Sequence, residues 1–345
     1  MPLHSFNPMT DRRWDALVAS HPESSVFHRR EWLQALVDTY GYQPIAVTSA
    51  EPGEPLSDGV VFCEVNSWIT GKRLVSLPFS DHCQPMLDEA TSHQDFLEWL
   101  VTATRNRRLR YIELRPLEWN SPAESLSACQ SFWLHTLDLT KPLEELFKNL
   151  DKNNLQRRIR KAERENLEYE KGSSEQLLDE LFQLLLITRR RHQLLPQPGS
   201  WFRNLAKNFK SDFEVRIARK DGRAIAAIVT LRHRRAIVYK YGCSDEQFHY
   251  LAGMPFLFWK VISESKAEQA VELDFGRTEP DNEGLLRFKD QFGTTRRKIT
   301  YLRYPQTTEE VKSIPSRVPY AGKIFSILPD AISWRLGSLL YRHMG

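Results

Sequence analysis

The sequence has few cysteines and no long apolar run, and each absence excludes a class of protein. Its 4 cysteines, Cys63, Cys83, Cys129 and Cys243, stand far apart and form no C-x-x-C pair. A disulfide framework or a zinc site needs a recognisable cysteine spacing, so we expect reduced thiols in a cytoplasmic protein. The longest apolar stretch, at 181–187, is far too short to span a bilayer.

Standard catalytic signatures are also missing. The chain has no G-x-x-x-x-G-K-[ST] phosphate loop, no G-x-S-x-G elbow, no H-E-x-x-H pair and no G-x-G-x-x-G turn. NTPases, serine hydrolases, zinc proteases and nicotinamide enzymes are therefore disfavoured, and no metal site is expected. The formal charge of +4 is small for 345 residues, and cations alternate with anions. A dense basic face for nucleic acid is not expected either.

What the sequence does contain is an order of helical and strand-like stretches that occurs twice. The first copy has helical periodicity, then three strand-like runs, then helix, strand, helix and strand. These stretches lie at 10–20, 29–40, 43–50, 58–65, 72–79, 92–107, 109–115, within 119–130, and at 132–139. After Pro142, which suits a first helical turn, the order repeats at 143–165, 177–191, 213–220, 224–232, 236–242, 254–266, 270–276, 282–291 and 298–304.

This repetition predicts an α/β fold of two tandem units, each a mixed sheet flanked by helices. We expect an N-terminal domain at 1–139, a C-terminal domain at 140–305 and a helical segment at 306–345. A helix starting near Pro329 is expected to pack back on the first domain. Because the segment is basic, contact with an anionic membrane surface is the alternative.

Two strands of the second unit end in polar residues. One, "VYKYGCS", ends near Gly242, and the other, "ELDFGRT", ends near Gly276. If they are parallel neighbours joined by the helix from Met254, their carboxyl ends face one side, where open α/β sheets bind ligands. Gly253 begins that helix, so free backbone N–H groups there would suit a phosphate; a plain helix entry is the alternative.

Several stretches resemble FemAB-like proteins of the GNAT superfamily of N-acyltransferases. The window "DFGRTEPDNEGLLRFKDQFG" has the succession Gly-Leu, Phe-Lys and Phe-Gly of that group, and "LPFSDHCQP", "NNLQRRIRKAERENLEYE", "TRRRHQLLPQPGSWF" and "YKYGCSD" are also similar to it. The resemblance covers nearly the whole chain. It is greatest to FemAB-type proteins associated with exosortase systems of envelope and exopolysaccharide gene neighbourhoods, and it implies two GNAT-like units.

The resemblance implies transfer of an acyl or aminoacyl group to an amine that attacks directly in an interdomain cleft. The co-substrate would be acyl-CoA or aminoacyl-tRNA, and the acceptor an amine of a peptidoglycan-related, other cell-envelope or exopolysaccharide compound. The [RQ]-x-x-G-x-[GA] loop that cradles CoA in other GNAT enzymes is not present at 247–256. The alternative is a scaffold without catalysis that serves as a binding or assembly factor at the inner membrane face. In either case a monomer or dimer is expected.

Lys289 matches the lysine of the family's Phe-Lys motif, and the resemblance places it with Phe288 at the acyl donor. A fixed ammonium can stabilise the oxyanion that forms when an amine attacks an ester or thioester. The alternative is a surface lysine between two core phenylalanines, Phe288 and Phe292.

Other candidates follow the strands. Arg277 could hold a phosphate or carboxylate through a forked contact, or pair with Asp281 or Glu279. Asp274 could orient a substrate amine or cap the next turn. Asp81 and His82, after the third strand, are the candidate general base, although a loop histidine can also be a structural donor.

Three further groups are less specific. Cys83 could be a nucleophile, but no base is recognisable for it. Arg189, Arg191 and His192 end a helix, where they would complement its dipole or bind an anionic acceptor in the cleft. Tyr239 and Tyr241 alternate with Lys240 and are expected on one face of their strand, in the core or in the cleft.

Overall fold

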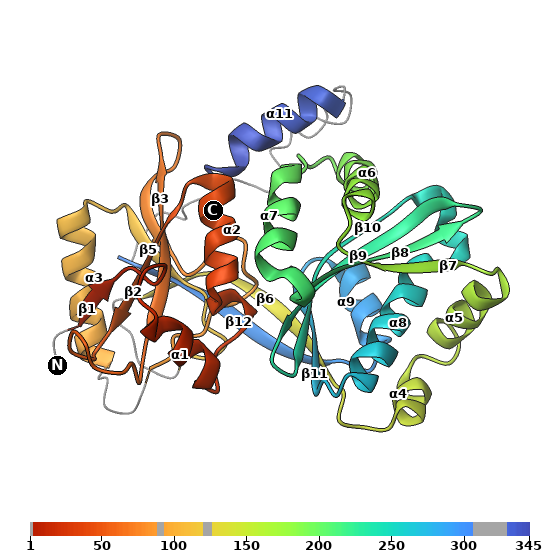
Figure 1. The fold of residues 1–345 in the computed structure, drawn as a ribbon, viewed down its shortest axis with the longest axis horizontal. Coiled ribbons are helices and arrows are strands. Elements are labelled where there is room, and N and C mark those ends of the chain that lie inside the picture. The colour runs from red at the N-terminus through yellow and green to blue at the C-terminus, as the bar shows by residue number, and fades with distance from the viewer. Residues whose placement is uncertain (1–2, 88–92, 120–125, 306–329) are drawn as a thin grey trace. The chain divides into compact units, whose positions relative to one another are not determined.

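A computed structural model describes residues 3–87, 93–119, 126–305 and 330–345 (Figure 1). The chain divides into two compact units. Of the described residues, unit 1 contains 3–87, 93–119, 126–132, 299–305 and 338–345, and unit 2 contains 133–298 and 330–337.

Unit 1 is built on strands in the order β1-β2-β3-β4-β5-β12. Its elements are β1 (His4–Phe6), α1 (Arg13–Ser20), η1 (Val26–His28), α2 (Arg30–Tyr40), β2 (Gln43–Thr48), β3 (Val60–Ser67), β4 (Gly71–Val75), α3 (His93–Arg107), β5 (Tyr111–Leu114), the first half of β6 (Ser127–Asp138) and the second half of β12 (Thr295–Tyr304). The strands β1 to β4 are antiparallel, β4 and β5 are parallel across α3, and β12 is antiparallel to β5.

Unit 2 has the strand order β6-β11-β10-β9-β8-β7. Its elements are α4 (Leu143–Asn149), α5 (Leu155–Arg164), β7 (Glu168–Gly172), α6 (Glu175–Arg191), α7 (Gly199–Phe209), η2 (Lys210–Asp212), β8 (Phe213–Lys220), β9 (Arg223–His233), β10 (Ala236–Ser244), η3 (Glu246–Leu251), α8 (Gly253–Ala267), β11 (Glu272–Thr278) and α9 (Glu283–Asp290). The helix α11 (Asp330–Tyr341) runs from unit 2 into unit 1. As predicted, β10 and β11 are parallel and are joined by α8.

The duplicated order is confirmed. In each unit three antiparallel strands are followed by a helix and a parallel strand, as β2-β3-β4-α3-β5 and as β8-β9-β10-α8-β11. The final strands change places, because β6 of the first repeat pairs with β11, and β12 of the second repeat pairs with β5. The unit boundaries therefore fall inside β6 and β12.

A helix was predicted within 119–130, of which 120–125 lie outside the described residues, and residues 127–130 begin β6. In this strand Ser127 Oγ donates to the Arg303 carbonyl of β12, and Cys129 Sγ donates to the Tyr301 carbonyl. The helix α7, with Pro198 as its N-cap, was not predicted. The predicted helix start at Pro329 lies outside the described residues.

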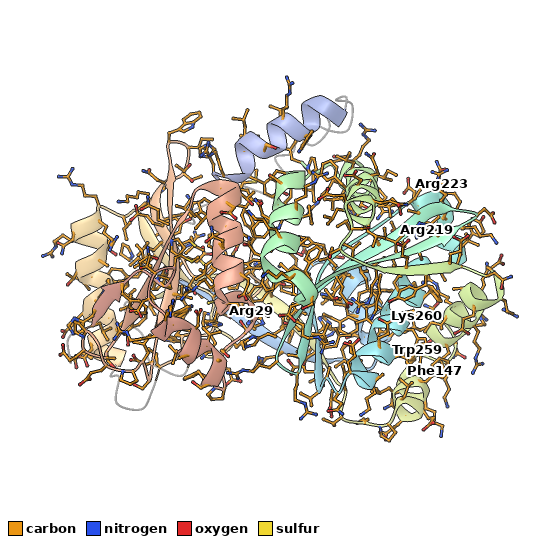
Figure 2. The ribbon with its side chains drawn as sticks, viewed as in Figure 1. Arg29, Phe147, Arg219, Arg223, Trp259 and Lys260 are labelled. Atoms are coloured by element: carbon orange, nitrogen blue, oxygen red, sulfur yellow. The ribbon has the colours of Figure 1, made fainter. Side chains whose placement is uncertain are left out.

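Unit 2 packs helices on both faces of its strands. Figure 1 shows α6 and α7 on one side of β8 to β10 and α5 and α8 on the other. Figure 2 labels Phe147 of α4 and Trp259 of α8, whose ring centroids lie 4.9 Å apart. On α5, Leu155 and Ile159 are fully buried, so this helix, predicted within 143–165, is amphipathic. Among the described residues no helix combines the length and apolar character needed to cross a membrane.

Candidate functional site

Unit 2 contains a cavity of about 640 Å³ at the carboxyl end of β10. Its walls come from the ends of α6 and β10, from η3, and from the starts of α8 and α9. Six of the predicted site residues line it directly, together with Phe288 from the Phe-Lys motif: Arg189, Arg191, His192, Tyr239, Tyr241 and Gly253.

The strands leave this space because their pairing ends early. The parallel register of β10 and β11 runs only from Ala236 opposite Glu272 to Val238 opposite Asp274. Immediately afterwards, the register of β10 against β9 shifts between Tyr239 and Tyr241. A bulge adds a residue to one strand and bends it away from its neighbour, so the carboxyl end of β10 is free to line the cavity.

The next strand, β11, has a bulge at the same level. Asp274 lies opposite Thr136 of β6, but Arg277 lies opposite Leu134, so β11 carries one extra residue between these pairs. Gly276 supplies the left-handed conformation that such a bulge needs, with φ of 72°. Its N–H donates to Asp274 Oδ1 at 2.6 Å, so Asp274 caps this turn, which was one of its two predicted roles.

Lys289 holds the same bulge from the other side. Its side chain is only 2% exposed, and Nζ donates to the carbonyls of Gly276 at 2.8 Å and Arg277 at 3.2 Å. The surface lysine considered as an alternative is therefore wrong. Lys289 does not line the cavity, but the preceding Phe288 does. The ammonium thus fixes the backbone beside the cavity, and Arg277 is half-buried next to it.

The cavity is strongly basic. Four cationic side chains line it, and the described residues of its lining include no carboxylate. These are Arg158, Arg189, Arg191 and Lys240. Arg191 reaches His249 Nε2 at 3.2 Å and His192 Nε2 at 3.3 Å. Burial and the neighbouring Arg191 lower the pKa of His249, so its ring is neutral near pH 7 and shares its Nε2 with the Ser244 hydroxyl at 2.9 Å.

Two of the cations have no counter-charge among the described residues. Within the described part of the chain, the guanidinium groups of Arg158 and Arg189 have no hydrogen-bonded or ionic partner. Burial lowers the pKa of Arg158, which shows that its partial desolvation is uncompensated. Unpaired cations that line a hollow are costly unless an anion joins them, so this arrangement is suited to a phosphate-bearing or carboxylate-bearing ligand.

The two tyrosines do not share a face. Tyr239 packs against Phe258 of α8, with ring centroids 4.7 Å apart. Tyr241 instead accepts a hydrogen bond from Trp201 Nε1 at 2.7 Å, on α7. The expected alternation fails because the extra residue at Lys240 shifts the register between them.

Two glycines, Gly242 and Gly253, leave room in the cavity, and the helix that begins there has no side-chain cap. A Cβ on Gly242 would lie 2.1 Å from the Tyr239 hydroxyl oxygen, and one on Gly253 would lie 3.0 Å from the Cβ of Ala226. The helix α8 has no side-chain cap, and Gly253 to Pro255 line the cavity. Uncapped N–H groups at a helix start add positive potential to a site that is already basic.

The candidates of unit 1 lie in a different environment. Asp81 and His82 are 8% and 6% exposed, the Asp81 carbonyl accepts a hydrogen bond from Tyr301 at 2.7 Å, and the His82 ring meets Phe27 edge-on. Their role as general base stays a prediction. Burial raises the pKa of the Cys83 thiol to about 12, which keeps it protonated and argues against a nucleophile.

The sequence did not single out several other polar residues that line the cavity, among them Arg158, Lys240, Ser244, His249 and Asn282. A signal existed for Arg158, because it is three residues after Leu155 and four before Ala162, which are both buried on α5. An arginine on the apolar face of a helix needs a reason. Among the described residues no group of His, Cys, Asp and Glu could hold a metal ion.

Comparisons of sequence agree with this location. Residues 151–290 match the family described as "Acetyltransferase (GNAT) domain". A stretch of 161 residues, 45% of this chain, is 27% identical to the UDP-N-acetylmuramoylpentapeptide-lysine N(6)-alanyltransferase of Weissella viridescens. The match spans 47% of that relative, about half its length.

Comparisons of structure give the fold of the whole chain. The crystal structure of FemX superposes with a TM-score of 0.69 at 13% identity, over 89% of this chain and 98% of FemX. The C-terminal domain (DUF2156) of a putative lysylphosphatidylglycerol synthetase from Agrobacterium fabrum gives 0.59 at 16% identity, over 86% and 92%. Residues 151–290 are thus similar to a GNAT domain, and the fold of the chain resembles that of FemX.

Proposed function

We propose that this protein is a FemX-like N-acyltransferase and that the cavity of unit 2 receives its acyl donor. Two comparisons support the class, namely the GNAT match over residues 151–290 and the partial identity to an alanyltransferase. The described residues that line the cavity all lie within 151–290, the region that matches the family. This agreement does not depend on the resemblance of any single residue.

The basic lining of the cavity carries the proposal. Arg158 and Arg189 lack counter-charges in the described chain, and the uncapped start of α8 adds backbone donors beside them. Aminoacyl-tRNA and acyl-CoA both carry phosphates, so either would neutralise these cations. Since 247–256 lacks the usual CoA loop, we propose aminoacyl-tRNA as the donor.

In the proposed reaction an acceptor amine attacks the acyl carbon of the donor ester. A C–N bond forms, the C–O bond to the ribose breaks, the amine loses a proton and the ribose oxygen gains one. We assign Lys289 the task of holding the bulged end of β11 and of providing positive potential to the developing oxyanion. Phe288 and Arg277 would contact the donor beside it, and Asp81 or His82 would accept the proton.

For the acceptor we propose an amine of a cell-envelope precursor. The relative from Weissella viridescens is named for transfer to the lysine of a UDP-linked muramoylpentapeptide, so a peptidoglycan precursor is the first candidate. An amine-bearing exopolysaccharide precursor, in the exosortase setting that the sequence resemblance implies, is the second.

Transfer assays with the full chain test this assignment. Alanyl-tRNA and acetyl-CoA, each labelled in the acyl group, are incubated with UDP-linked muramoylpentapeptide and with amino-sugar acceptors, and labelled amide is measured. We expect amide from alanyl-tRNA. Amide from acetyl-CoA alone would overturn the donor but keep the class, and failure of both donors to bind would overturn the function.

A substitution at Lys289 tests its role. Lys289→Met should lower kcat by about 10²–10³-fold, the usual loss when an oxyanion-stabilising group is removed, and it should leave the carbonyls of Gly276 and Arg277 without this donor. Arg287→Ala is the matched control, because Arg287 is 73% exposed on the same helix. Circular dichroism checks the fold of both variants, and undiminished kcat in a folded Lys289→Met protein would refute the role.

A further inference from the structure

The turn between β3 and β4 in unit 1 exposes two large apolar side chains. Trp68 is 87% exposed and Ile69 is 43% exposed. Hydrogen bonds within the turn stabilise it, because Ser67 Oγ accepts from the N–H groups of Ile69 at 3.2 Å and Thr70 at 3.0 Å. Exposing an indole ring at a fixed position has no benefit for folding, so these side chains are available to something outside the chain.

A second exposed apolar segment is fastened to the same turn. The His343 ring lies 5.9 Å from the Trp68 ring, its Nδ1 is 2.9 Å from Ser67 Oγ, and its carbonyl accepts from Thr70 Oγ1 at 3.1 Å. The buried Arg73 also donates to the His343 carbonyl, at 2.9 Å. Leu339 is 60% exposed and Met344 is 41% exposed beside this anchor. We call the four exposed side chains Trp68, Ile69, Leu339 and Met344 the apolar tip.

The charge around the apolar tip is positive. Residues 65–75 and 338–345 contain no aspartate or glutamate. Arg110 is exposed, and its Nη1 lies 3.4 Å from the Thr70 carbonyl. Arg342, next to His343, is exposed as well. An exposed indole with branched and linear apolar neighbours inside a cationic rim is the composition of an interfacial membrane contact.

We propose that the apolar tip docks this protein on an anionic phospholipid surface. Trp68 and Ile69 would enter the boundary between headgroups and acyl chains, and Arg110 and Arg342 would lie against lipid phosphates. Cations near such a surface strengthen binding through attraction to the anionic headgroups. A lipid suits this patch better than a protein does, because four side chains on two short segments are too few for the core of a standard protein interface. This docking does not depend on the reaction proposed above.

Vesicle co-sedimentation of the full chain tests the docking. Vesicles of equal phosphatidylglycerol and phosphatidylcholine are compared with vesicles of phosphatidylcholine alone. We expect binding to the anionic vesicles only, weakened by salt. Trp68→Ser combined with Ile69→Ser should reduce the partition coefficient at least about 10-fold, since it removes most of the inserting apolar surface. Arg110→Glu combined with Arg342→Glu should abolish the preference for anionic vesicles.

Val101→Ser combined with Ile187→Ser is the matched control, since both residues are 39% exposed and lie outside the apolar tip. Binding by this control at the level of the unchanged protein is expected. The proposal is overturned if the unchanged protein does not bind, or if the Trp68 and Ile69 variant binds equally well. It is also overturned if sedimentation velocity shows that this variant abolishes a dimer, because the apolar tip would then face a second copy.

Discussion

The two units differ at the carboxyl end of their equivalent parallel strand pairs, which are β4 with β5 in unit 1 and β10 with β11 in unit 2. In unit 1 the register ends with Glu113, and the chain continues Glu113-Leu114-Arg115. In unit 2 the register ends with Asp274, and the chain continues Asp274-Phe275-Gly276-Arg277. Both stretches read acid, apolar residue and arginine, but unit 2 has one additional glycine. That single residue is the bulge of β11.

Without the glycine, the arginine of unit 1 turns inward and fills the strand end. Arg115 donates to Glu113 Oε1 at 3.0 Å and to the Leu77 carbonyl at 2.7 Å, and it lies over the Tyr301 ring. Arg303 donates to the other oxygen of Glu113 at 2.7 Å. The loop after β4 is thereby fastened onto the end of β5, and a buried carboxylate neutralises the charge.

In unit 2 the additional glycine forms a bulge whose backbone groups are bound by neighbouring side chains, and a cavity remains at the strand end. Asp274 binds the Gly276 N–H, Lys289 binds the carbonyls of Gly276 and Arg277, and Arg158 and Arg189 at the neighbouring cavity stay unpaired in the described chain. The two units have the same order of elements, but the strand end is filled by side chains in unit 1, which we call the closed end, and borders a cavity in unit 2, which we call the open end. The difference shows that ligand space in this fold depends on local register and on where the charges are neutralised.

Removing the carboxylate should damage the closed end most. Glu113→Gln leaves the guanidinium groups of Arg115 and Arg303 buried without their anion, and breaking a buried ion pair in this way costs about 3–5 kcal/mol of unfolding free energy. Urea denaturation measures the loss, with the exposed Glu23→Gln as control. A change below the error of the fit would show that the triad does not hold unit 1 together.

Acid should reproduce part of this effect. Burial opposes ionisation of Glu113, but Arg115 and Arg303 outweigh it, and the pKa of this carboxyl lies below its usual value. Its contribution is therefore present above the usual pKa of glutamate and is lost as pH falls through the lowered value.

The open end should lose affinity rather than stability. Arg158→Met combined with Arg189→Met should weaken binding of the phosphate-bearing donor at least about 100-fold, because each charge-assisted contact contributes about 1.5–3 kcal/mol. The salt dependence of binding should fall with it. Filter binding over a salt series measures both, and Arg164→Met, exposed at the end of α5, is the control.

The free protein should tolerate this double substitution. Since neither guanidinium has a partner in the described chain, its removal breaks no ion pair and should not lower the unfolding free energy. Unchanged donor affinity in the double variant would place the donor outside the cavity.

The smallest effect concerns the side of β11 that faces β6. His135 is fully buried near Lys289, Asp290 and Arg296, and burial followed by repulsion from Lys289 lowers its pKa to about 4. An unfolded histidine titrates near 6.5, so the unfolded chain binds more protons between these values and stability falls as pH falls from about 6.5 to 4. We expect a loss of at most about 3 kcal/mol.

His135→Leu should flatten this part of the pH profile. Urea denaturation at several pH values compares the variant with the unchanged protein, and the ratio of slopes is the readout. An equally steep profile in the variant would assign the acid sensitivity to other groups, such as Glu113 in unit 1.

The sequence by itself determined the duplicated order, the parallel partnership of β10 and β11, and the concentration of polar residues at their carboxyl ends. These features follow from local periodicity and from turn residues, which act within a few positions along the chain. The same local reasoning placed Arg189, Arg191, His192 and Gly253 at element ends, and these residues do line one cavity.

Only the tertiary structure decided the exchange of β6 and β12, the burial of Lys289 and the convergence of Arg158 with Arg189. Each depends on pairing between residues far apart in sequence, which no local pattern encodes. The bulges could not be predicted from local patterns either. Nothing in the sequence around Gly276 indicates a bulge, which arises because β11 has one residue more than β6 between two paired positions. Lys289 is buried because that extra residue frees two carbonyls, and an ammonium thirteen positions away is the donor that reaches them.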